Sequence, residues 1–347
     1  MHRAFRDGAD GAVGHERDGC YWWVLEVPRG PGPPAPVPRA VPRAPYPGGM
    51  TETGTETTPA AGPDPAARGA SLSPSRASDF MQCPLLYRFR VLDKLPEKPS
   101  AAATRGTVVH TVLERLFDIP RGDRTPEAAL RLLRPAWDEL LAKRPELAEL
   151  FDDGEGGVAA AELADWLGGA EQLVERYFTL EDPNMLEPAR RELYVETKLD
   201  DGLTLRGYVD RLDVAPTGDV RVVDYKTGKA PSARFEDKAL FQMKFYALVL
   251  WRQYGRLPRR LQLVYLGSGD IVRYDPDEQD LLAVERKLRA LWTAIQQATR
   301  TGDWRPNRTK LCGWCDHQAV CPEFGGTPPA YPLPVVAVTG PAETSAE

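Results

Sequence analysis

The sequence has no long hydrophobic run and no excess of basic side chains. The one apolar cluster before residue 70, Tyr21 to Leu25, is far shorter than the roughly 20 residues of a membrane-spanning helix, and no later run reaches that length. We therefore expect a cytoplasmic protein without a membrane segment. Asp and Glu number 50 against 44 Lys and Arg, a net charge of −6. This balance argues against a uniformly basic nucleic-acid-binding surface but permits a local basic groove.

A nucleotide-binding loop is also missing. To complete the phosphate-binding motif G-x-x-x-x-G-K-[ST], the pair Gly228-Lys229 would need a glycine and a hydroxyl residue at flanking positions that hold Val223 and Ala230. The sequence shows no internal repeat either. We therefore expect no ATPase motor in this chain.

Composition divides the chain into three parts. Residues 1–70 are rich in Pro, Gly and Ala and show no sustained periodicity, which is typical of a disordered segment. Residues 325–347 are Pro-rich and acidic and are expected to form a disordered tail. The folded part is therefore predicted to be residues 71–324, which is long enough for one large domain.

Hydrophobic spacing predicts one α/β domain with a single sheet. Apolar residues recur at helical spacing over residues 105–118, with the helix beginning at Gly106, and a helical insertion is expected at about 120–185 around the Gly-rich stretch DDGEGG. Short turns between the first three predicted strands favour antiparallel pairing. Strands are predicted at 192–199, 203–214, 220–227, 261–267 and 271–274, and further helices at 239–251 and 277–300.

Two carboxylates and a lysine are predicted to converge on this sheet. Asp224 and Lys226 are two residues apart on a strand and therefore project from the same face, and the turn before that strand brings Asp210 close to Asp224. A carboxylate can bind a hard divalent cation, and a nearby ammonium can orient water or neutralise charge on a phosphate. An isolated pair of this kind is usually ordinary surface. Here, however, Val222 shares the face of Asp224, and a charge on a buried face is costly without a function.

Three further polar residues lie in apolar surroundings. His110 stands beside the apolar stripe of the first helix, and Gln242 and Tyr246 are four apart in the most apolar helix, so they share a face. Each has an ordinary explanation when taken alone. A boundary histidine finds a hydrogen bond, and a core tyrosine packs its ring and bonds its hydroxyl.

Taken in chain order, these residues belong to a set of motifs. The stretches are GTVVH, GYVD, DYK and QMKFY. The set resembles the RecB-type branch of the PD-(D/E)XK nuclease superfamily, and the resemblance extends over about residues 73–322. It implies a restriction-endonuclease-like α/β core in which a mixed sheet is flanked by helices.

The resemblance also implies roles for the residues that match the motifs. In the family, such a site binds Mg²⁺ or Mn²⁺, and the matching ligands are His110, Asp210, Asp224 and the backbone carbonyl of Tyr225. The lysine of the motif would activate or orient the attacking water, and the Gln and Tyr would position substrate. The implied catalytic residues are Asp210, Asp224, Lys226, Gln242 and Tyr246.

The cysteines form a second candidate site. In a reducing compartment, clustered cysteines indicate metal ligands rather than disulfides. Spacing alone leaves two alternatives open: a zinc site formed by Cys312, Cys315, His317 and Cys321, or a site completed by the distant Cys83. The resemblance favours the second, because one iron–sulfur subgroup has one cysteine before the core and three after it. It implies a [4Fe-4S] cluster held by Cys83, Cys312, Cys315 and Cys321.

The resemblance implies a metal-dependent DNA exonuclease that hydrolyses phosphodiester bonds at single-stranded ends in repair or recombination, with any helicase as a separate partner. Two alternatives stay open: a CRISPR-associated adaptation nuclease of the same fold, and a non-catalytic nucleic-acid-binding module that keeps an iron–sulfur or zinc site. Candidates for phosphate contacts are the arginine pairs Arg88 and Arg90, Arg190 and Arg191, and Arg305 and Arg308, although any one of them taken alone is more often a solvated surface residue.

Overall fold

The computed structural model of this chain describes residues 71–152, 159–232 and 236–331. The segment predicted to be disordered, 1–70, and the tail from 332 onward lie outside the described residues, as does most of the Gly-rich stretch in the insertion. The described chain continues beyond the predicted boundary at Phe324. Tyr331 still packs its ring against Trp304, with ring centroids 5.8 Å apart. Among the described helices, none is long and apolar enough to cross a membrane.

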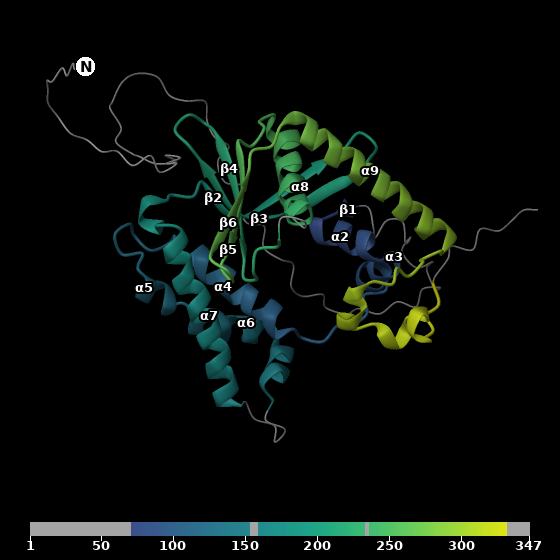
Figure 1. Cartoon of the computed structure of the whole chain (residues 1–347), viewed down its shortest axis with the longest axis horizontal. Coiled ribbons are helices and arrows are strands. Elements are labelled where there is room, and N and C mark those ends of the chain that lie inside the picture. The colour runs from purple at the N-terminus through teal and green to yellow at the C-terminus, as the bar shows by residue number, and fades with distance from the viewer. Residues whose placement is uncertain (1–70, 153–158, 233–235, 332–347) are drawn as a thin grey trace, which may run out of the picture.

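A mixed six-stranded sheet forms the centre of the described chain (Figure 1). The strand order is β1-β3-β4-β5-β6, with β2 also paired to β3. The pairs β1–β3 and β4–β5 are parallel, and the other pairs are antiparallel. The bounds are β1 (Ser71–Leu72), β2 (Arg190–Lys198), β3 (Thr204–Val214), β4 (Val220–Lys226), β5 (Arg260–Tyr265) and β6 (Asp270–Tyr274).

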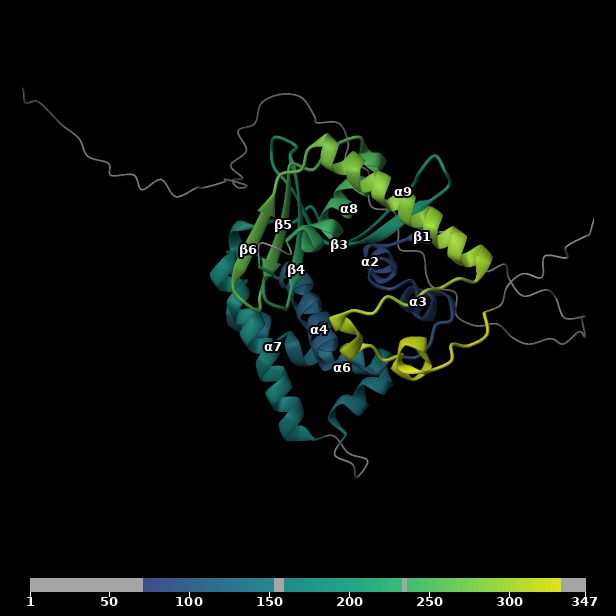
Figure 2. The same ribbon diagram turned by 45° about the vertical axis from the view of Figure 1, so that its right-hand side comes forward.

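Helices cover both faces of this sheet, which confirms the predicted α/β class (Figures 1 and 2). On one face lie α2 (Pro74–Gln82), α3 (Pro84–Tyr87), α8 (Glu236–Tyr254) and α9 (Glu278–Thr301). On the other lie α4 (Ala101–Leu116), α5 (Pro126–Leu130), α6 (Leu133–Lys143) and α7 (Ala160–Leu180). Successive side chains of a strand alternate between faces, so Val222 belongs to the core under α8 and Val223 to the core under α4 and α7.

Every strand predicted from the sequence is present, with ends within two residues of the predicted ones. Two features differ. The strand β1 was missed, because two residues are too few to show a period-two pattern. The helix α4 begins at Ala101 rather than Gly106, because the side chain of Ser100 caps it by accepting a hydrogen bond from the Ala103 N–H at 3.3 Å.

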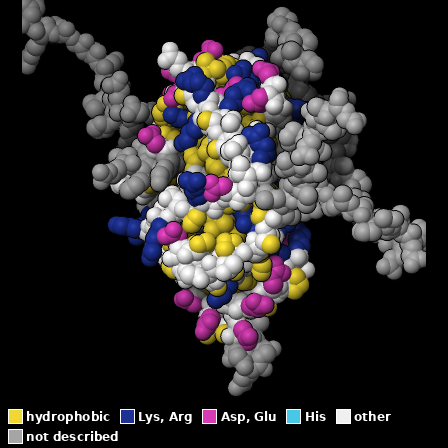
Figure 3. Space-filling view, turned by 90° about the vertical axis from the view of Figure 1, so that its right-hand side faces the viewer, with side chains coloured by type: hydrophobic (Ala, Val, Ile, Leu, Met, Phe, Trp, Pro, Cys, Tyr) yellow, Lys and Arg dark blue, Asp and Glu magenta, His cyan; other side chains and the backbone are white. Residues whose placement is uncertain are grey.

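The C-terminal segment returns to the start of the folded part. After α9, three short 3₁₀ turns at Lys310–Trp314, Gln318–Val320 and Pro322–Phe324 lie beside α2 and α3 (Figures 1 and 2). Figure 3 shows the face on this side of the molecule. Hydrophobic side chains gather in its middle and acidic ones toward its lower end, so the described part of this face has no continuous basic surface.

Candidate active site

Three potential metal ligands converge from three different elements. His110 comes from α4, Glu192 from β2 and Asp210 from β3, and their ligand atoms all lie within 4.8 Å of one another. His110 and Asp210 were predicted, whereas Glu192 was not. The pairs Arg191–Arg211 and Leu193–Val209 lie on either side of Glu192 and Asp210, so these two residues lie opposite each other. The backbone of Glu192 has φ 44°, in the left-handed region that a glutamate rarely adopts.

The tautomer of His110 follows from its neighbours. The ring atom Nε2 lies 2.9 Å from the carbonyl oxygen of Tyr225. A carbonyl can only accept, so Nε2 carries the hydrogen and Nδ1 has the free lone pair. Burial lowers the pKa of His110, which favours this neutral form. Since Nδ1 lies 3.4 Å from Asp210 Oδ2, its lone pair faces a carboxylate oxygen, and this contact is favourable only with a proton or a cation between the two atoms.

The carboxylates of this site resist ionisation. Burial raises the pKa of Asp210 well above its usual range, and the nearby charge of Asp224 raises it further. Burial, with help from Glu114 and Asp224, raises the pKa of Glu192 to about 7. A divalent cation would offset both the burial and the repulsion, so the site has the electrostatics of a cation site.

A second group of residues forms one hydrogen-bonded network. Lys226 Nζ donates to Gln242 Oε1 at 2.8 Å, and Gln242 Nε2 donates to Asp224 Oδ1 at 2.9 Å and to the hydroxyl oxygen of Tyr246 at 3.2 Å. Lys226 Nζ also lies 2.7 Å from Asp224 Oδ2, an ion pair without hydrogen-bond geometry. Spacing predicted that Asp224 and Lys226 share a face of one strand and that Gln242 and Tyr246 share a face of one helix. The structure brings these two pairs together, one from β4 and the other from α8.

Asp224 belongs to this network rather than to the group formed by His110, Glu192 and Asp210. Its side chain is 2% exposed, and its oxygens face Gln242 and Lys226. The Tyr225 carbonyl does face His110, at 2.9 Å. The roles of Asp224 and Tyr225 as ligands therefore stay predictions.

The backbone opens between β3 and β4 at this point. Their ladder ends at the pair Arg211 and Val223, although each strand continues. One residue further along, the side chain of Asp210 takes the place of a backbone acceptor, because its Oδ2 accepts the Tyr225 N–H at 2.8 Å. The Asp210 carboxylate thus satisfies the donor that the separated strands would leave without a partner.

Comparison with known proteins shows the family to which this chain belongs. The family model of the PD-(D/E)XK nuclease superfamily matches residues 71–322. The chain belongs to this superfamily. It is thereby placed among nucleases, hydrolases that act on nucleic acid, and the family typically uses divalent metal ions.

Two bacteriophage proteins and one bacterial protein of known structure are similar to this PD-(D/E)XK protein. The Gene 69 protein of Mycobacterium phage L5 is 25% identical over 293 residues, which cover 73% of this chain and 96% of the relative. The Gene 69 protein of Mycobacterium phage D29 is 29% identical over 279 residues, with the same two coverages, 73% and 96%. The crystal structure of a candidate exonuclease from Eubacterium rectale superimposes with a TM-score of 0.46 at 15% identity, covering 77% of this chain and 95% of that one.

A groove of about 650 Å³ opens beside the lysine network of this nuclease-family protein. Lys226, Gln242 and Tyr246 form one side of it, and the first turn of α2 with part of the β2–β3 hairpin forms the rest. Its volume lies in the range of sites that hold a ligand the size of a small organic molecule. Lys226, Gln242 and Tyr246 are therefore accessible from solvent.

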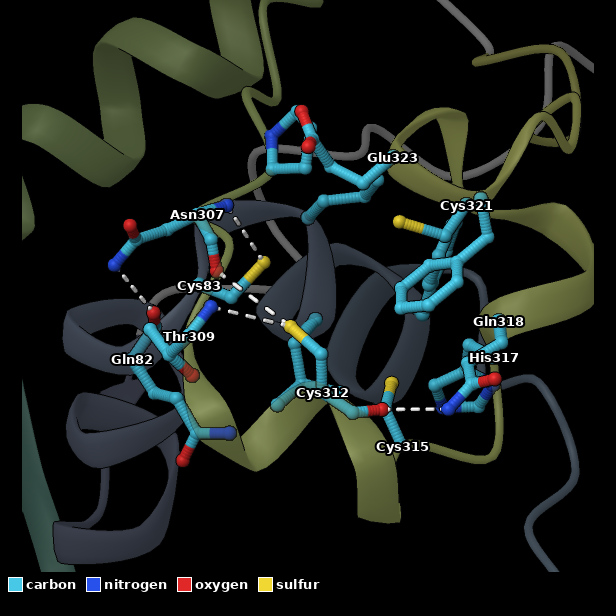
Figure 4. Close-up of a pocket in the computed structure, with 15 residues that line it drawn as sticks. Gln82, Cys83, Asn307, Thr309, Cys312, Cys315, His317, Gln318, Cys321 and Glu323 are labelled. Atoms are coloured by element: carbon cyan, nitrogen blue, oxygen red, sulfur yellow. Dashed lines mark hydrogen bonds between the residues drawn. The ribbon is translucent and has the colours of Figure 1, made fainter.

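The four predicted cysteine ligands surround a separate pocket (Figure 4). Cys83 comes from the junction of α2 and α3, and Cys312, Cys315 and Cys321 come from the C-terminal turns. All four thiols are free. Two of the sulfurs already accept backbone hydrogen bonds, Cys83 Sγ from the Asn307 N–H at 3.4 Å and Cys312 Sγ from the Thr309 N–H at 3.3 Å.

The fifth candidate, His317, also lines the pocket but is held by other partners. Its Nε2 lies 3.1 Å from Glu97 Oε1, and its ring packs edge-on against Phe89 with centroids 5.3 Å apart. In this part of the described chain, no three Cys or His ligand atoms lie within 4.8 Å of one another. The zinc and the iron–sulfur alternatives both stay predictions.

The predicted arginine rim is wrong at Arg88. Its side chain is buried, its Nε pairs with Asp93 Oδ2 at 2.9 Å, and its guanidinium lies over the ring of Tyr331. Arg90 is held by Asp79 and Glu97 through two ion pairs. The sequence could not predict that these acidic residues pair with Arg88 and Arg90, because the pairs form only in the folded chain. The arginines that line the groove are Arg76 and Arg206 instead.

Proposed function

We propose that this chain is a metal-dependent DNA nuclease of the RecB type, which hydrolyses phosphodiester bonds at single-stranded ends. The observation that carries the proposal is the meeting of two groups at the opening between β3 and β4. One group consists of a histidine and two carboxylates whose ligand atoms lie within 4.8 Å, and the other is the network around Lys226. A binding module has no need of both.

The donor set fits a divalent cation. The site offers one imidazole lone pair and two carboxylates, which are ligands that suit Mg²⁺ or Mn²⁺. The pKa of both carboxyl groups is raised, most strongly for Asp210, so a cation that stabilises their charged form would be favoured. We propose His110, Glu192 and Asp210 as ligands, together with Asp224 and the Tyr225 carbonyl. When bound, such a cation stabilises charge on the scissile phosphate and increases the acidity of water.

The protein's own residues would prepare the substrate. Lys226 projects toward the groove and carries the positive charge that can hold a water molecule or neutralise a phosphate oxygen. Gln242 fixes Lys226 and Asp224 relative to each other by donating to one and accepting from the other. The Tyr246 hydroxyl accepts from Gln242 and so stays free to donate to a phosphate oxygen.

The test is a digestion assay on end-labelled single- and double-stranded DNA with Mg²⁺ or Mn²⁺. We expect the wild type to cleave, and Asp224→Ala and Lys226→Ala to lose cleavage by orders of magnitude while melting cooperatively. Asp219→Ala is the matched control, because this aspartate is exposed just before the same strand. Wild-type cleavage by either site variant would refute the assignment. Binding without turnover in Mn²⁺ would favour the non-catalytic module.

We further propose that Cys83, Cys312, Cys315 and Cys321 hold a [4Fe-4S] cluster. The meeting of all four cysteines at one pocket supports it, because Cys83 lies between α2 and α3 whereas the other three come from the C-terminal turns. Such a cluster would tie the C-terminal turns to α2 and α3. Anaerobically purified protein should be brown and contain iron, and Cys83→Ala should lose it. A colourless protein that keeps one zinc ion after Cys83→Ala would refute the cluster.

A further inference from the structure

Two tyrosines on the β2–β3 hairpin are unusually open to solvent. Tyr194 is 44% exposed and Tyr208 is 56% exposed. They lie directly opposite each other in the strand register, with ring centroids 5.2 Å apart and a tilt of 56° between the rings. The Tyr194 hydroxyl donates to Glu196, which fixes the orientation of that ring. The hairpin thus presents two aromatic surfaces that no described residue covers fully.

The pair stands next to the proposed metal site. Along the β2–β3 ladder, Tyr194 and Tyr208 lie two residues from Glu192 and Asp210, respectively. Two residues of strand span about 7 Å. Both tyrosines also line the groove that contains Lys226. A ligand on the rings would therefore extend directly toward the reacting groups.

The charge of the groove is opposite to that of the chain. Its thirteen described lining residues include Arg76, Arg206 and Lys226 and no aspartate or glutamate, whereas the whole chain has a net charge of −6. The hydroxyls of Ser73 and Ser75, at the start of α2, line the same groove. Guanidinium, ammonium and hydroxyl groups are the usual protein ligands of phosphate.

Aromatic faces combined with basic groups suit a single-stranded nucleic acid. Its unpaired bases can lie on aromatic rings while its phosphates contact the basic side chains. The bases of a duplex are paired and stacked inside the helix, so they cannot reach the rings without being flipped out.

We propose that Tyr194 and Tyr208 form a base-stacking platform for single-stranded DNA, which places the adjoining phosphate between Lys226 and the proposed metal ligands. The platform rests on the proposed nuclease function and adds the reason for a single-strand preference. Arg76 and Arg206 contact the flanking phosphates in this arrangement.

Binding without catalysis tests the platform directly. Binding of a fluorescent oligo(dT) is measured by fluorescence anisotropy in EDTA. Binding of a blunt hairpin duplex is measured in the same way for comparison. We expect Tyr194→Leu and Tyr208→Leu to weaken oligo(dT) binding on the order of 5- to 100-fold each and to change duplex binding little. Tyr208→Phe keeps the ring and should bind as the wild type does. Tyr254→Leu is the control, since Tyr254 is similarly exposed, at 48%, near the end of α8 and outside the groove.

A crosslinking arm uses the wild-type protein and so does not depend on the folding of a variant. Oligonucleotides with 4-thiothymidine should form photoadducts on Tyr194 or Tyr208. Adducts confined to other parts of the chain, no binding of oligo(dT) by the wild type, or leucine variants that bind like the wild type would each overturn the platform.

The two proposals fail in different ways. If the wild type binds oligo(dT) through the tyrosines but cleaves nothing in Mn²⁺, the nuclease function is wrong and the platform stands. If the wild type cleaves DNA and the leucine variants bind and cleave single strands equally well, the platform is wrong and the nuclease function stands.

Discussion

Replacing Glu192 by glutamine should stabilise the metal-free protein at neutral and alkaline pH. Glu192 faces Asp210 across the β2–β3 ladder, and burial together with Glu114 and Asp224 raises its pKa to about 7. Glutamine keeps the shape of the side chain and removes its charge. The backbone at φ 44° is unchanged by this substitution, so the difference measures the charge alone.

The size of the effect follows from the pKa shift. A rise from 4.5 to about 7 corresponds to about 3 kcal/mol, at 1.36 kcal/mol per pKa unit. Because the carboxyl is only partly buried, solvent screening reduces this to about 1–2 kcal/mol. A folded-state pKa above the unfolded one favours the neutral form in the native state. The free energy of unfolding of the wild type therefore falls as the pH rises from the unfolded pKa of 4.5 through 7. Glu192→Gln should be no more stable than the wild type below pH 4.5, and its full gain in unfolding free energy should be reached above pH 7.

Urea unfolding in EDTA at pH 4 and pH 8 measures the difference. Glu196→Gln is the control, because it changes an exposed glutamate on the same strand. No gain in unfolding free energy at pH 8, or an equal gain at pH 4, would refute the reasoning. The same samples test the ligand role. With Mn²⁺ at about 100 times its Kd, the wild type should gain about 2.7 kcal/mol, and Glu192→Gln should gain clearly less.

Three other outcomes are expected. Gly207→Ala would place a Cβ 2.7 Å from the ring of Tyr246, so it should lower cleavage and cost about 1–3 kcal/mol in urea unfolding. Gly228→Ala, with no described atom within 4 Å of its Cβ, should do neither. The Mn²⁺-induced rise in melting temperature should be larger at pH 8 than at pH 5.5, because the raised pKa of Asp210 lets protons compete with the metal; equal rises would count against this site. His317→Ala should keep the iron content that Cys83→Ala loses, whereas loss of metal in His317→Ala would restore the zinc alternative.

The parts of the site that the sequence predicted are those set by short spacings. Asp224 and Lys226 meet because alternate residues of one strand share a face, and Gln242 and Tyr246 meet because residues four apart share a face of a helix. The same alternation places Val222 in the core beside Asp224, as expected. These local rules hold without knowledge of the tertiary structure.

Glu192 was missed because its position depends on strand register. The stretch ELYVETKL is an ordinary strand sequence with an acidic first residue. Only when the hairpin pairs Leu193 with Val209 does Glu192 come opposite Asp210. Register is set by the turn and by the buried face together, so a single strand cannot specify it. An acidic residue placed symmetrically to Asp210 about the DDG turn was the one available signal.

The separation of β3 from β4 explains why the site forms at this place. From Arg211 and Val223 to the turn between the strands, β3 and β4 are joined by a regular ladder, which leaves no room between them. On the other side of these two residues, β3 stays paired to β2 and β4 stays paired to β5, but β3 and β4 are no longer paired to each other. The sheet therefore opens between β3 and β4. Such a break exposes backbone groups, and here the Asp210 carboxylate accepts the Tyr225 N–H while the Tyr225 carbonyl turns to His110. The side chains that repair the broken ladder are therefore the same ones that are proposed to bind the metal.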